Sequence, residues 1–445
     1  MWQIRRNWRE KRINMKIEIR RRLEAVRRGE VPEGYKKTKV GIVPEGWELG
    51  SLKDILHLET RSVPKPDKPY WRLGLLSHAK GTFHELIENP ETVQMDVLYQ
   101  VKDKDLIVNI TFAWEHAIAL AGENDEGMLV SHRFPTYVFN KKMSPEFFGA
   151  IVRQKWFKEL LVNISPGGAG RNRVMSKSAF LKLPCFIPPY SEQQKIAEIL
   201  DAYEKVIRLK ENLLAEKRNQ KKWLLENLLD PNSGVRLLGF KEEWEERSLE
   251  ELGVFSKGFG ISNDDCQTGE SPCIKYGDIY MHYNYFVDKP VSYTENDIAN
   301  KSKIVNAGTL LFTGSGEDPL EIGKCVAYLG KEKIAVGGDI IIMVPYNVNP
   351  LFLSYQQYTA KLINRKAELS QGYSVVHIYV DQIKSLRVFI PPTIKEQEAI
   401  ANVLFQMDNE INLLDKELKG WSIMKKVLMQ VLLTGIVRVN FKEKS

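Results

Sequence analysis

The chain lacks the apolar segments that would place it in or across a membrane. Its 445 residues contain no run of about 18 uncharged apolar residues, which a transmembrane helix would need. The basic N-terminus has neither the apolar stretch nor the small-residue cleavage site of a secretory signal. We therefore expect a cytoplasmic protein without a membrane span.

Cysteine is also scarce, and its spacing argues against a metal site. The sequence has four cysteines, and none forms a CxxC pair or stands next to a histidine. They are Cys185, Cys266, Cys273 and Cys325. We expect free thiols in a reducing compartment, and we predict no bound metal.

Motifs of the common catalytic classes are missing as well. There is no GxxxxGK[ST] phosphate loop, so we do not expect ATP hydrolysis by this chain. A DNA adenine methyltransferase would carry Asn or Asp before its Pro-Pro pair, whereas Ile187 and Ile390 stand there. The run from Trp114 to His116 has no visible nucleophile or metal partner. We predict that the chain is not an enzyme and holds no cofactor.

What the chain does have is an excess of positive charge. It carries 64 Lys and Arg against 57 Asp and Glu, for a net charge of +7. Such a balance suits a polyanionic partner such as nucleic acid. Residues 1–29 are especially rich in Lys and Arg and are expected to form a basic helix.

The most informative feature is a long motif that occurs twice. The first copy reads FIPPYSEQQKIAEIL from Phe186, and the second reads FIPPTIKEQEAIANVL from Phe389. Proline interrupts neither continuation, so helices are predicted over about 192–229 and 396–433, each about 57 Å long. A seven-residue row matches type for type between the copies: Leu200, Ile207, Leu214, Lys221 and Leu228 with Leu404, Ile411, Leu418, Lys425 and Leu432.

Apolar rows with a seven-residue period indicate helices that pack along other helices. We interpret the shared row as the seam that joins the two copies. A further row is apolar throughout only in the second copy, and it is predicted to bind a partner protein. That row consists of Ile400, Met407, Leu414, Trp421 and Leu428.

The repeat extends to the bodies that precede each helix, roughly 56–182 and 253–385. Each has a β-rich strand, DLIVNIT or TLLFTGS, and then a helix that begins at Ser144-Pro145 or Asn349-Pro350. Each continues through a glycine-containing loop at 165–173 or 370–377. Few residues agree otherwise, which is the pattern expected of two modules that share a scaffold and read different targets.

The IPP…EQ…IA…L helices, the GW and EW-x-x-x-S-L motifs and the terminal LLTG at Leu432–Gly435 resemble one known family. They are similar to the DNA-specificity (S) subunits of type I restriction–modification systems, over roughly residues 34–440. The first copy departs from the pattern at Asp230-Pro231, where the second has Thr434-Gly435.

The resemblance implies an α+β fold with two α/β target-recognition domains. A pair of long antiparallel helices, a coiled-coil spacer, would separate them in a pseudo-twofold internal repeat. Each domain would read one half of a bipartite, asymmetric double-stranded DNA site. The helices would dock two methyltransferase (modification) subunits, and two restriction (translocase and nuclease) subunits would complete the enzyme. Catalysis, the methyl donor and ATP would belong to those partners.

The resemblance and the repeat together give expected boundaries. They are 1–33 for a basic extension, 34–186 for the first recognition domain, 187–230 for the first spacer helix, 231–389 for the second recognition domain, 390–437 for the second spacer helix and 438–445 for a tail.

DNA-contacting residues are expected among Arg, Lys, Asn, His and aromatic side chains in the bodies. Lys and Arg bind phosphates, Arg pairs with guanine and Asn with adenine. In the first body the candidates are Arg171, Asn172, Arg173, Trp114, His116 and Arg133. In the second they are Lys275, Tyr276, Tyr283, Lys324, Tyr373 and His377.

Two other hypotheses remain open on the sequence. The chain could be a coiled-coil interaction scaffold whose bodies bind protein, or an autonomous methyltransferase or nuclease. Co-purification with a methyltransferase subunit would separate the first from DNA recognition. Methyl transfer or cleavage by the chain alone would favour the second.

Overall fold

The computed structural model describes residues 18–39, 41–167, 173–262, 265 and 269–439, and the chain divides into two compact units. Unit 1 comprises residues 1–209 and 418–445, and unit 2 comprises residues 210–417. Each long helix therefore contributes one part to each unit. Among the described residues, none of the helices combines the length and the apolar character that a membrane span requires.

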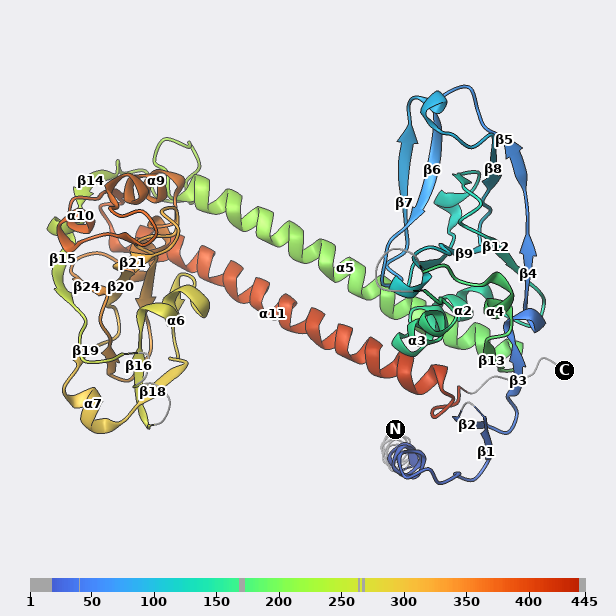
Figure 1. The fold of residues 1–445 in the computed structure, drawn as a ribbon. Helices are drawn as coiled ribbons and strands as arrows, with labels where there is room; N and C mark the ends of the chain where they lie inside the picture. Colours follow the sequence, from blue (N-terminus) through green and yellow to red (C-terminus); the bar gives the residue numbers. More distant parts are fainter. Residues whose placement is uncertain (1–17, 40, 168–172, 263–264, 266–268, 440–445) are drawn as a thin grey trace. The chain divides into compact units, whose positions relative to one another are not determined.

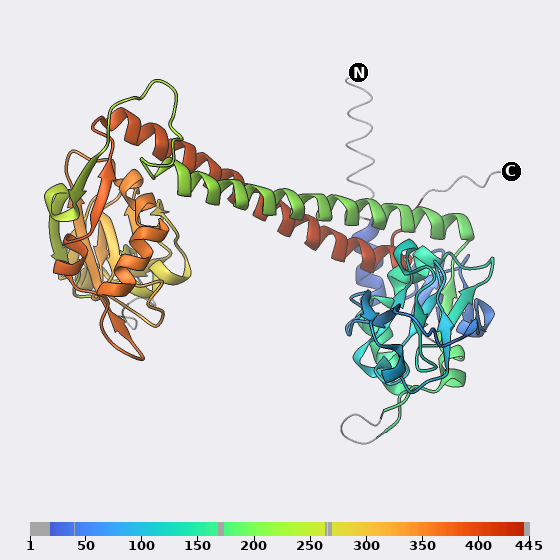
Figure 2. The same cartoon turned by 90° about the horizontal axis from the view of Figure 1, so that it is seen from above.

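Two long helices match the predicted pair. Helix α5 (Tyr190–Leu228) has 39 residues and α11 (Ile394–Leu433) has 40. They run antiparallel, as both views show (Figures 1 and 2). In unit 1 the ring of Tyr203 on α5 lies 5.3 Å from that of Trp421 on α11. The prediction of two α/β bodies with a pair of long antiparallel helices is thus confirmed.

In unit 2 the same two helices are joined by ion pairs. Lys210 Nζ lies 2.6 Å from Glu417 Oε2, and Lys217 Nζ lies 2.8 Å from Glu410 Oε2. In the first copy of the repeat these lysines take the positions that Leu414 and Trp421 hold in the second, and they face carboxylates of α11.

Unit 1 holds thirteen of the strands that the described residues form, and most of them belong to two sheets. They are β1 (Tyr35–Thr38), β2 (Gly41–Pro44), β3 (Glu48–Ser51), β4 (Leu56–Glu59), β5 (Ser62–Pro64), β6 (Tyr70–Leu75), β7 (Thr82–Ile87), β8 (Val97–Gln100), β9 (Leu106–Val108), β10 (Ile118–Leu120), β11 (Leu129–Val130), β12 (Thr136–Phe139) and β13 (Pro184–Ile187). Its shorter helices are η1 (Leu52–Asp54), η2 (Pro90–Thr92), η3 (Ala113–Glu115), η4 (Glu123–Asp125), α2 (Pro145–Val152), α3 (Lys155–Asn163) and α4 (Lys177–Leu181).

Unit 2 is built from a similar set. Its strands are β14 (Glu245–Ser248), β15 (Gly253–Lys257), β16 (Ser271–Ile274), β17 (Phe286–Val287), β18 (Ser292–Thr294), β19 (Lys303–Val305), β20 (Leu310–Thr313), β21 (Ser315–Gly316), β22 (Cys325–Tyr328), β23 (Ile334–Val336), β24 (Ile340–Pro345), β25 (Val376–His377) and β26 (Arg387–Ile390). Its shorter helices are η5 (Leu249–Leu252), α6 (Tyr276–Met281), α7 (Asn296–Asn300), α8 (Pro350–Gln356), α9 (Ala360–Leu369) and α10 (Val380–Lys384).

The two units share their sheet topology although their sequences differ. One sheet has the order β10-β9-β12-β4 in unit 1 and β22-β20-β24-β15 in unit 2, with β17 added at its edge. The other has the order β7-β6-β11-β8 in unit 1 and β18-β16-β23-β19 in unit 2, with β5 added in unit 1. The sequence repeat is therefore a repeat of fold.

Each unit pairs the strand that precedes its body with the strand that leads into a long helix. β3 pairs antiparallel with β13, and β14 pairs antiparallel with β26. The predicted helix starts are also present. Ser144 caps α2 by accepting a hydrogen bond from Phe147 N, and Asn349 caps α8 by accepting one from Phe352 N.

The long helices belong to the cores of the units. In unit 1, Ile196 of α5 and Leu432 of α11 are buried in the cluster that contains Phe147 of α2. In unit 2, Leu228 of α5 and Leu404 of α11 are buried in the cluster that contains Phe352 of α8. The helix segments and bodies of each unit therefore fold as one structure.

A buried Glu-Gln pair at the start of each long helix fixes this arrangement. In unit 1, Glu192 accepts hydrogen bonds from Trp47 Nε1 at 3.1 Å and from Arg438 Nε at 2.6 Å. Gln193 Oε1 accepts from Ser144 N at 2.8 Å, which ties the helix start to the cap of α2.

Unit 2 repeats the contacts with equivalent residues. Glu396 accepts from Trp244 Nε1 at 3.2 Å and from Arg236 at 2.6 and 2.8 Å. Gln397 Oε1 accepts from Asn349 N at 2.7 Å. In both units, the arginine follows the end of the long helix that runs antiparallel to the one carrying the glutamate.

The predicted basic N-terminal helix is described only in part. Residues 18–27 are helical, and residues 1–17 lie outside the described ranges. Arg22 Nη1 from this helix donates to Ile436 O at 3.1 Å, next to the end of α11.

Candidate functional site

Three segments of unit 1 converge beside the end of strand β9. Ile110 N donates to Arg133 O at 2.9 Å, and Met175 N donates to Ile110 O at 2.8 Å. The segment after β9, the segment before β12 and the residues that follow the glycine-containing loop thus lie side by side.

Unit 2 uses the same backbone hydrogen bonds. Gly314 N donates to Asp339 O at 2.7 Å, and Ile378 N donates to Gly314 O at 2.9 Å. The three equivalent segments follow β20, precede β24 and follow the glycine-containing loop 370–377. A shared framework therefore presents unlike side chains in the two units, and we name these two places the reading surfaces.

The reading surface of unit 1 combines aromatic and basic groups. The Arg173 guanidinium lies 5.6 Å from the centre of the Trp114 ring, as in a cation–π contact. Trp114 Nε1 donates to Thr111 O at 3.1 Å, which fixes the indole. Phe112, two residues before Trp114, is exposed, and so is Arg133, whose backbone bonds to Ile110.

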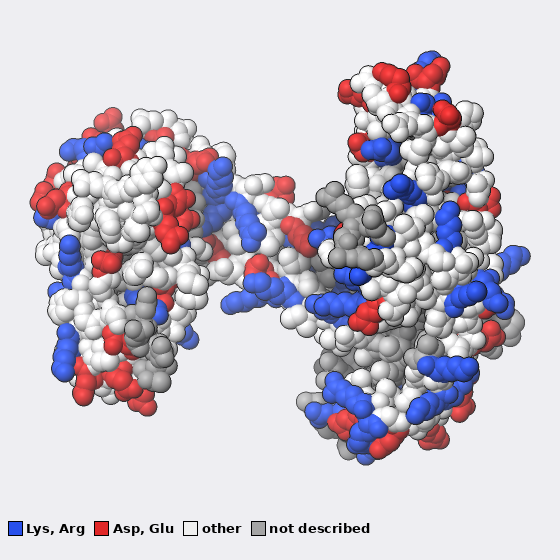
Figure 3. Space-filling model, viewed as in Figure 1, with Lys and Arg blue, Asp and Glu red and all other residues white. Residues whose placement is uncertain are grey.

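The reading surface of unit 2 has a histidine and tyrosines instead. His377 Nδ1 lies 3.0 Å from Ser315 Oγ, and its ring stacks with Tyr379 at 6.4 Å. Tyr373 in the glycine loop is fully exposed. Such groups can bond to base edges or stack on bases. On the visible face of each unit, Lys and Arg are interspersed with Asp and Glu (Figure 3).

Comparison with known proteins assigns the family. Residues 44–216 and 241–419 match the model of the type I restriction modification DNA specificity domain. The chain belongs to this family. It is 24% identical over 439 residues to the type I restriction enzyme MjaVIII specificity subunit of Methanocaldococcus jannaschii, which covers 92% of this chain and 97% of that protein. A second relative from that organism, MjaX, is 25% identical over 440 residues, with the same shares covered.

Solved structures support the fold. The crystal structure of a type I restriction–modification S subunit from M. genitalium aligns with a TM-score of 0.54 at 14% identity. The alignment covers 89% of this chain and 97% of that one. The chain is thus a specificity subunit, a non-catalytic part of a type I restriction–modification complex.

Two predicted DNA-contacting residues of unit 1, Arg171 and Asn172, lie outside the described residues. His116 is only 4% exposed, and its Nε2 bonds to Val152 O at 2.6 Å. Burial lowers the pKa of His116. Its ring is thus held inside unit 1, which corrects the expectation that it contacts DNA.

Unit 2 requires a similar correction. Tyr283 is buried, and its hydroxyl accepts a hydrogen bond from Val291 N at 2.7 Å. Lys324 is half-buried and donates to Tyr280 O at 3.1 Å, and burial lowers its pKa. Lys275 and Tyr276 are half-buried at the start of α6. His377 and Tyr373 remain the best-placed candidates of this unit.

The described side chains offer little for metal binding or thiol chemistry. No group of three or more His, Cys, Asp or Glu among them could hold a metal ion. Burial raises the pKa of Cys185 and of Cys325 to about 12, so both thiols stay protonated.

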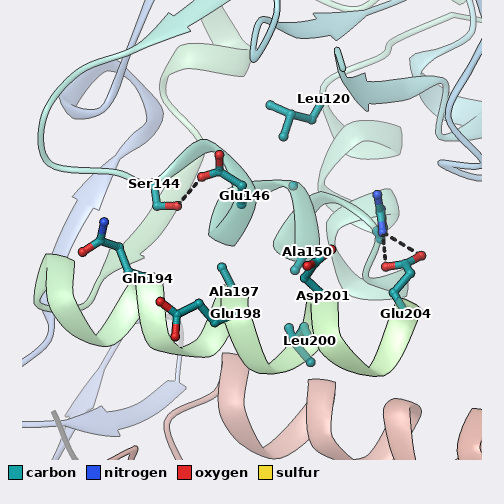
Figure 4. A pocket seen from close by; sticks show the side chains of 12 residues that line it. Leu120, Ser144, Glu146, Ala150, Gln194, Ala197, Glu198, Leu200, Asp201 and Glu204 are labelled. Atoms are coloured by element: carbon teal, nitrogen blue, oxygen red, sulfur yellow. Dashed lines mark hydrogen bonds and ion pairs between the residues drawn. The ribbon is translucent and has the colours of Figure 1, made fainter. Parts of the chain in front are cut away.

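Unit 1 also has a groove of about 450 Å³ between α2 and α5. Carboxylates line it, and Figure 4 shows Glu146 bonded to Ser144 and Glu204 bonded to a basic side chain. That basic group is Arg153, 3.0 Å from Glu204. Because carboxylates repel phosphates, this groove is unsuited to DNA.

The apolar row of α11 that was predicted to bind a partner protein is largely in contact with the rest of the chain. Ile400 and Met407 are buried within unit 2, and Trp421 packs against Tyr203. Leu414 and Leu428 are half-buried. Ile400 packs in the cluster that contains Leu228 of α5 and Phe352 of α8, and Met407 is buried as well, so neither side chain is free for a partner.

Arg236 and Arg438 are structural residues that sequence reasoning missed. A Val-Arg dipeptide recurs at 235–236 and 437–438, within eight residues after the end of each long helix, and could have indicated them.

Proposed function

We propose that each unit of this specificity subunit reads one half of a bipartite DNA site through its reading surface. The support is the shared backbone framework, which presents Trp114, Arg133 and Arg173 in unit 1 but Ser315 and His377 in unit 2. The same backbone framework with different side chains is what two domains that recognise different DNA sequences require.

In unit 1, Arg173 is the strongest candidate for base contact. A guanidinium can donate two hydrogen bonds to guanine, and its contact with Trp114 limits the orientations it can adopt. Exposed Arg133 would contribute phosphate contacts and so affinity rather than specificity.

The test is to express the chain with its methyltransferase subunit and map methylated adenines by sequencing. One bipartite consensus is expected, and Arg173→Ala should relax one half of it only. Arg365→Ala, an exposed substitution on α9, should change neither half. A wild-type complex that methylates without any bipartite consensus would overturn the proposal.

We further propose that methyltransferase subunits dock on the exposed apolar residues of the long helices, and that restriction subunits join that complex. In unit 1, Ile423, Met424 and Val427 of α11 are 65%, 51% and 48% exposed. Together they form an exposed apolar strip, as expected of a helix that binds another protein.

Replacing Ile423 and Val427 by Asp should abolish co-purification with the methyltransferase subunit while the fold is kept. The matched control is Gln406→Asp, which adds a carboxylate at an exposed position of α11 that is polar. Retained co-purification of the double variant would refute this docking site.

A further inference from the structure

The loop that follows the central strand ends in the same backbone conformation in both units. In unit 1 it runs from β9 to β10, and His116, two residues before β10, has φ of 69°. In unit 2 it runs from β20 to β22, and Gly323, two residues before β22, has φ of 64°. Both are left-handed, a conformation that Gly adopts freely and His rarely. Each loop carries part of its reading surface.

In unit 1 the left-handed residue anchors the loop itself. The buried His116 ring bonds through Nε2 to Val152 O, at the last residue of α2. The imidazole therefore joins the end of the loop to the end of the helix.

In unit 2 the left-handed residue is glycine, and the anchor comes from elsewhere. Lys366 on α9 is 3% exposed, and its Nζ donates to Gly323 O at 3.0 Å and to Gln357 O at 3.1 Å. Gln357 stands seven positions after Pro350, the first residue of α8, as Val152 stands seven after Pro145 (357 − 350 and 152 − 145). The same carbonyl position is thus bonded in both units.

The lysine itself has an apolar counterpart. Lys366 is six positions after the start of α9, and Leu161 is six after the start of α3 (366 − 360 and 161 − 155). Leu161 is fully buried. A buried ammonium group is costly unless carbonyl oxygens or a counter-charge compensate it, and the described residues give Lys366 no carboxylate partner. We therefore interpret the hydrogen bond to the Gly323 carbonyl as the reason that a lysine occupies this buried position.

We propose that His116 and Lys366 are positioning residues, each holding the reading loop of its own unit against the helix end and so setting discrimination at one half-site. The inference rests on the proposed function of the two units. Neither side chain contacts DNA in this scheme. Each acts through the loop that carries Thr111 and Trp114 in unit 1 or Ser315 in unit 2.

A transplant of one anchor into the other unit tests the proposal. Lys366→Leu installs the residue of unit 1 and removes both hydrogen bonds made by Nζ, and it should reduce discrimination at the second half-site by about tenfold. Gly323→His combined with Lys366→Leu should restore it. A Cβ at Gly323 would lie 2.9 Å from Lys366 Cδ, so the histidine needs the shorter leucine beside it.

The readout is the consensus of methylated adenines made by the complex with the methyltransferase subunit. His116→Asn should relax only the half-site that Arg173→Ala relaxes, because Asn tolerates the left-handed conformation but is too short to reach Val152. Lys361→Leu, an exposed change on α9, should alter neither half.

Three outcomes would overturn the inference. They are an unchanged second half-site in Lys366→Leu, equal relaxation of both half-sites, and failure of the double variant to improve on the single one. Absence of a bipartite consensus in the wild type would instead count against the proposed function.

Discussion

Lys221 in unit 2 and Lys425 in unit 1 occupy the same position of the repeated helix, but their surroundings differ. Lys221 pairs with Asp408 and lies 3.6 Å from the centre of the Tyr285 ring, and both charged side chains are almost buried. Burial lowers the pKa of Lys221, and Asp408 opposes that effect. Lys425 lies 3.1 Å from Glu204, which is half exposed.

The difference originates in the helix that packs beside the pair. Tyr355 of α8 donates its hydroxyl to Asp408 Oδ2 at 2.6 Å and covers the pair. Ala150 holds the matching position of α2 and leaves the groove of Figure 4 open to solvent. Tyr355, together with the Tyr285 ring, therefore keeps the ion pair of unit 2 from water, whereas that of unit 1 is hydrated. The two pairs should contribute differently to stability.

The largest effect is expected from breaking the buried pair. Asp408→Ala should destabilise unit 2 by about 3–5 kcal/mol, because the Lys221 ammonium would stay buried without its partner. Glu204→Ala in unit 1 should cost about 0–1 kcal/mol, since water replaces the lost carboxylate. Native-state hydrogen exchange in urea would report each unit separately. Equal losses in the two units would contradict this account of burial.

The two loop anchors, His116 in unit 1 and Lys366 in unit 2, should also differ in how they affect stability at alkaline pH. Burial lowers the pKa of Lys366 to about 8 from its ordinary 10.5. Between these values the unfolded chain binds more protons than the folded one, so the stability of unit 2 should rise with pH, by about 3 kcal/mol in full. Lys366→Met should lack this rise.

Urea unfolding of the wild type and Lys366→Met between pH 7.5 and 10 would measure the difference. The other titratable groups facing this lysine are Cys325 and, through Cys325 O, Tyr358. Burial raises the pKa of both in the folded chain, so each lowers stability as pH rises, opposite to Lys366. Both groups are present in the two proteins, so their effect is removed when the wild type and Lys366→Met are compared. A pH-independent difference between the two proteins would rule out titration of Lys366.

The two Glu-Gln pairs should behave alike, in contrast to the lysine pairs. Glu192→Gln and Glu396→Gln should each cost about 2 kcal/mol, because each weakens charge-assisted hydrogen bonds to an arginine and an indole. Hydrogen exchange in each unit would test this. A loss of stability in only one unit would show that the same hydrogen-bond geometry contributes differently to the stability of the two units.

The sequence predicted the helices because their period is strong and local. The shared row includes Leu200, Leu214 and Leu404, and the structure buries all three. The helix starts at Ser144 and Asn349 were equally predictable, since capping depends on neighbouring residues.

The sites were harder to predict, because they depend on contacts between distant segments. His116 is of a residue type that contacts DNA, but its ring bonds Val152 O, which belongs to a helix that sequence spacing does not relate to it. Ile400 and Met407 resembled a free apolar row, but they are covered within their own unit. Periodicity shows that a face is apolar and leaves open what covers it.

The smallest predicted effect concerns His116 at acid pH. Burial lowers its pKa below the ordinary 6.5, and the nearby charges of Lys158 and His78 lower it further. As pH falls through 6.5, the unfolded chain takes up a proton that the folded chain resists, so unit 1 should lose stability. His116→Asn should remove this component, and hydrogen exchange of unit 1 between pH 7.5 and 5 would measure it. Gly323 holds the equivalent position in unit 2 and cannot titrate, so unit 2 is the internal control. If the substitution removed the same acid sensitivity from both units, the proton would have to act at a shared group rather than at this loop anchor.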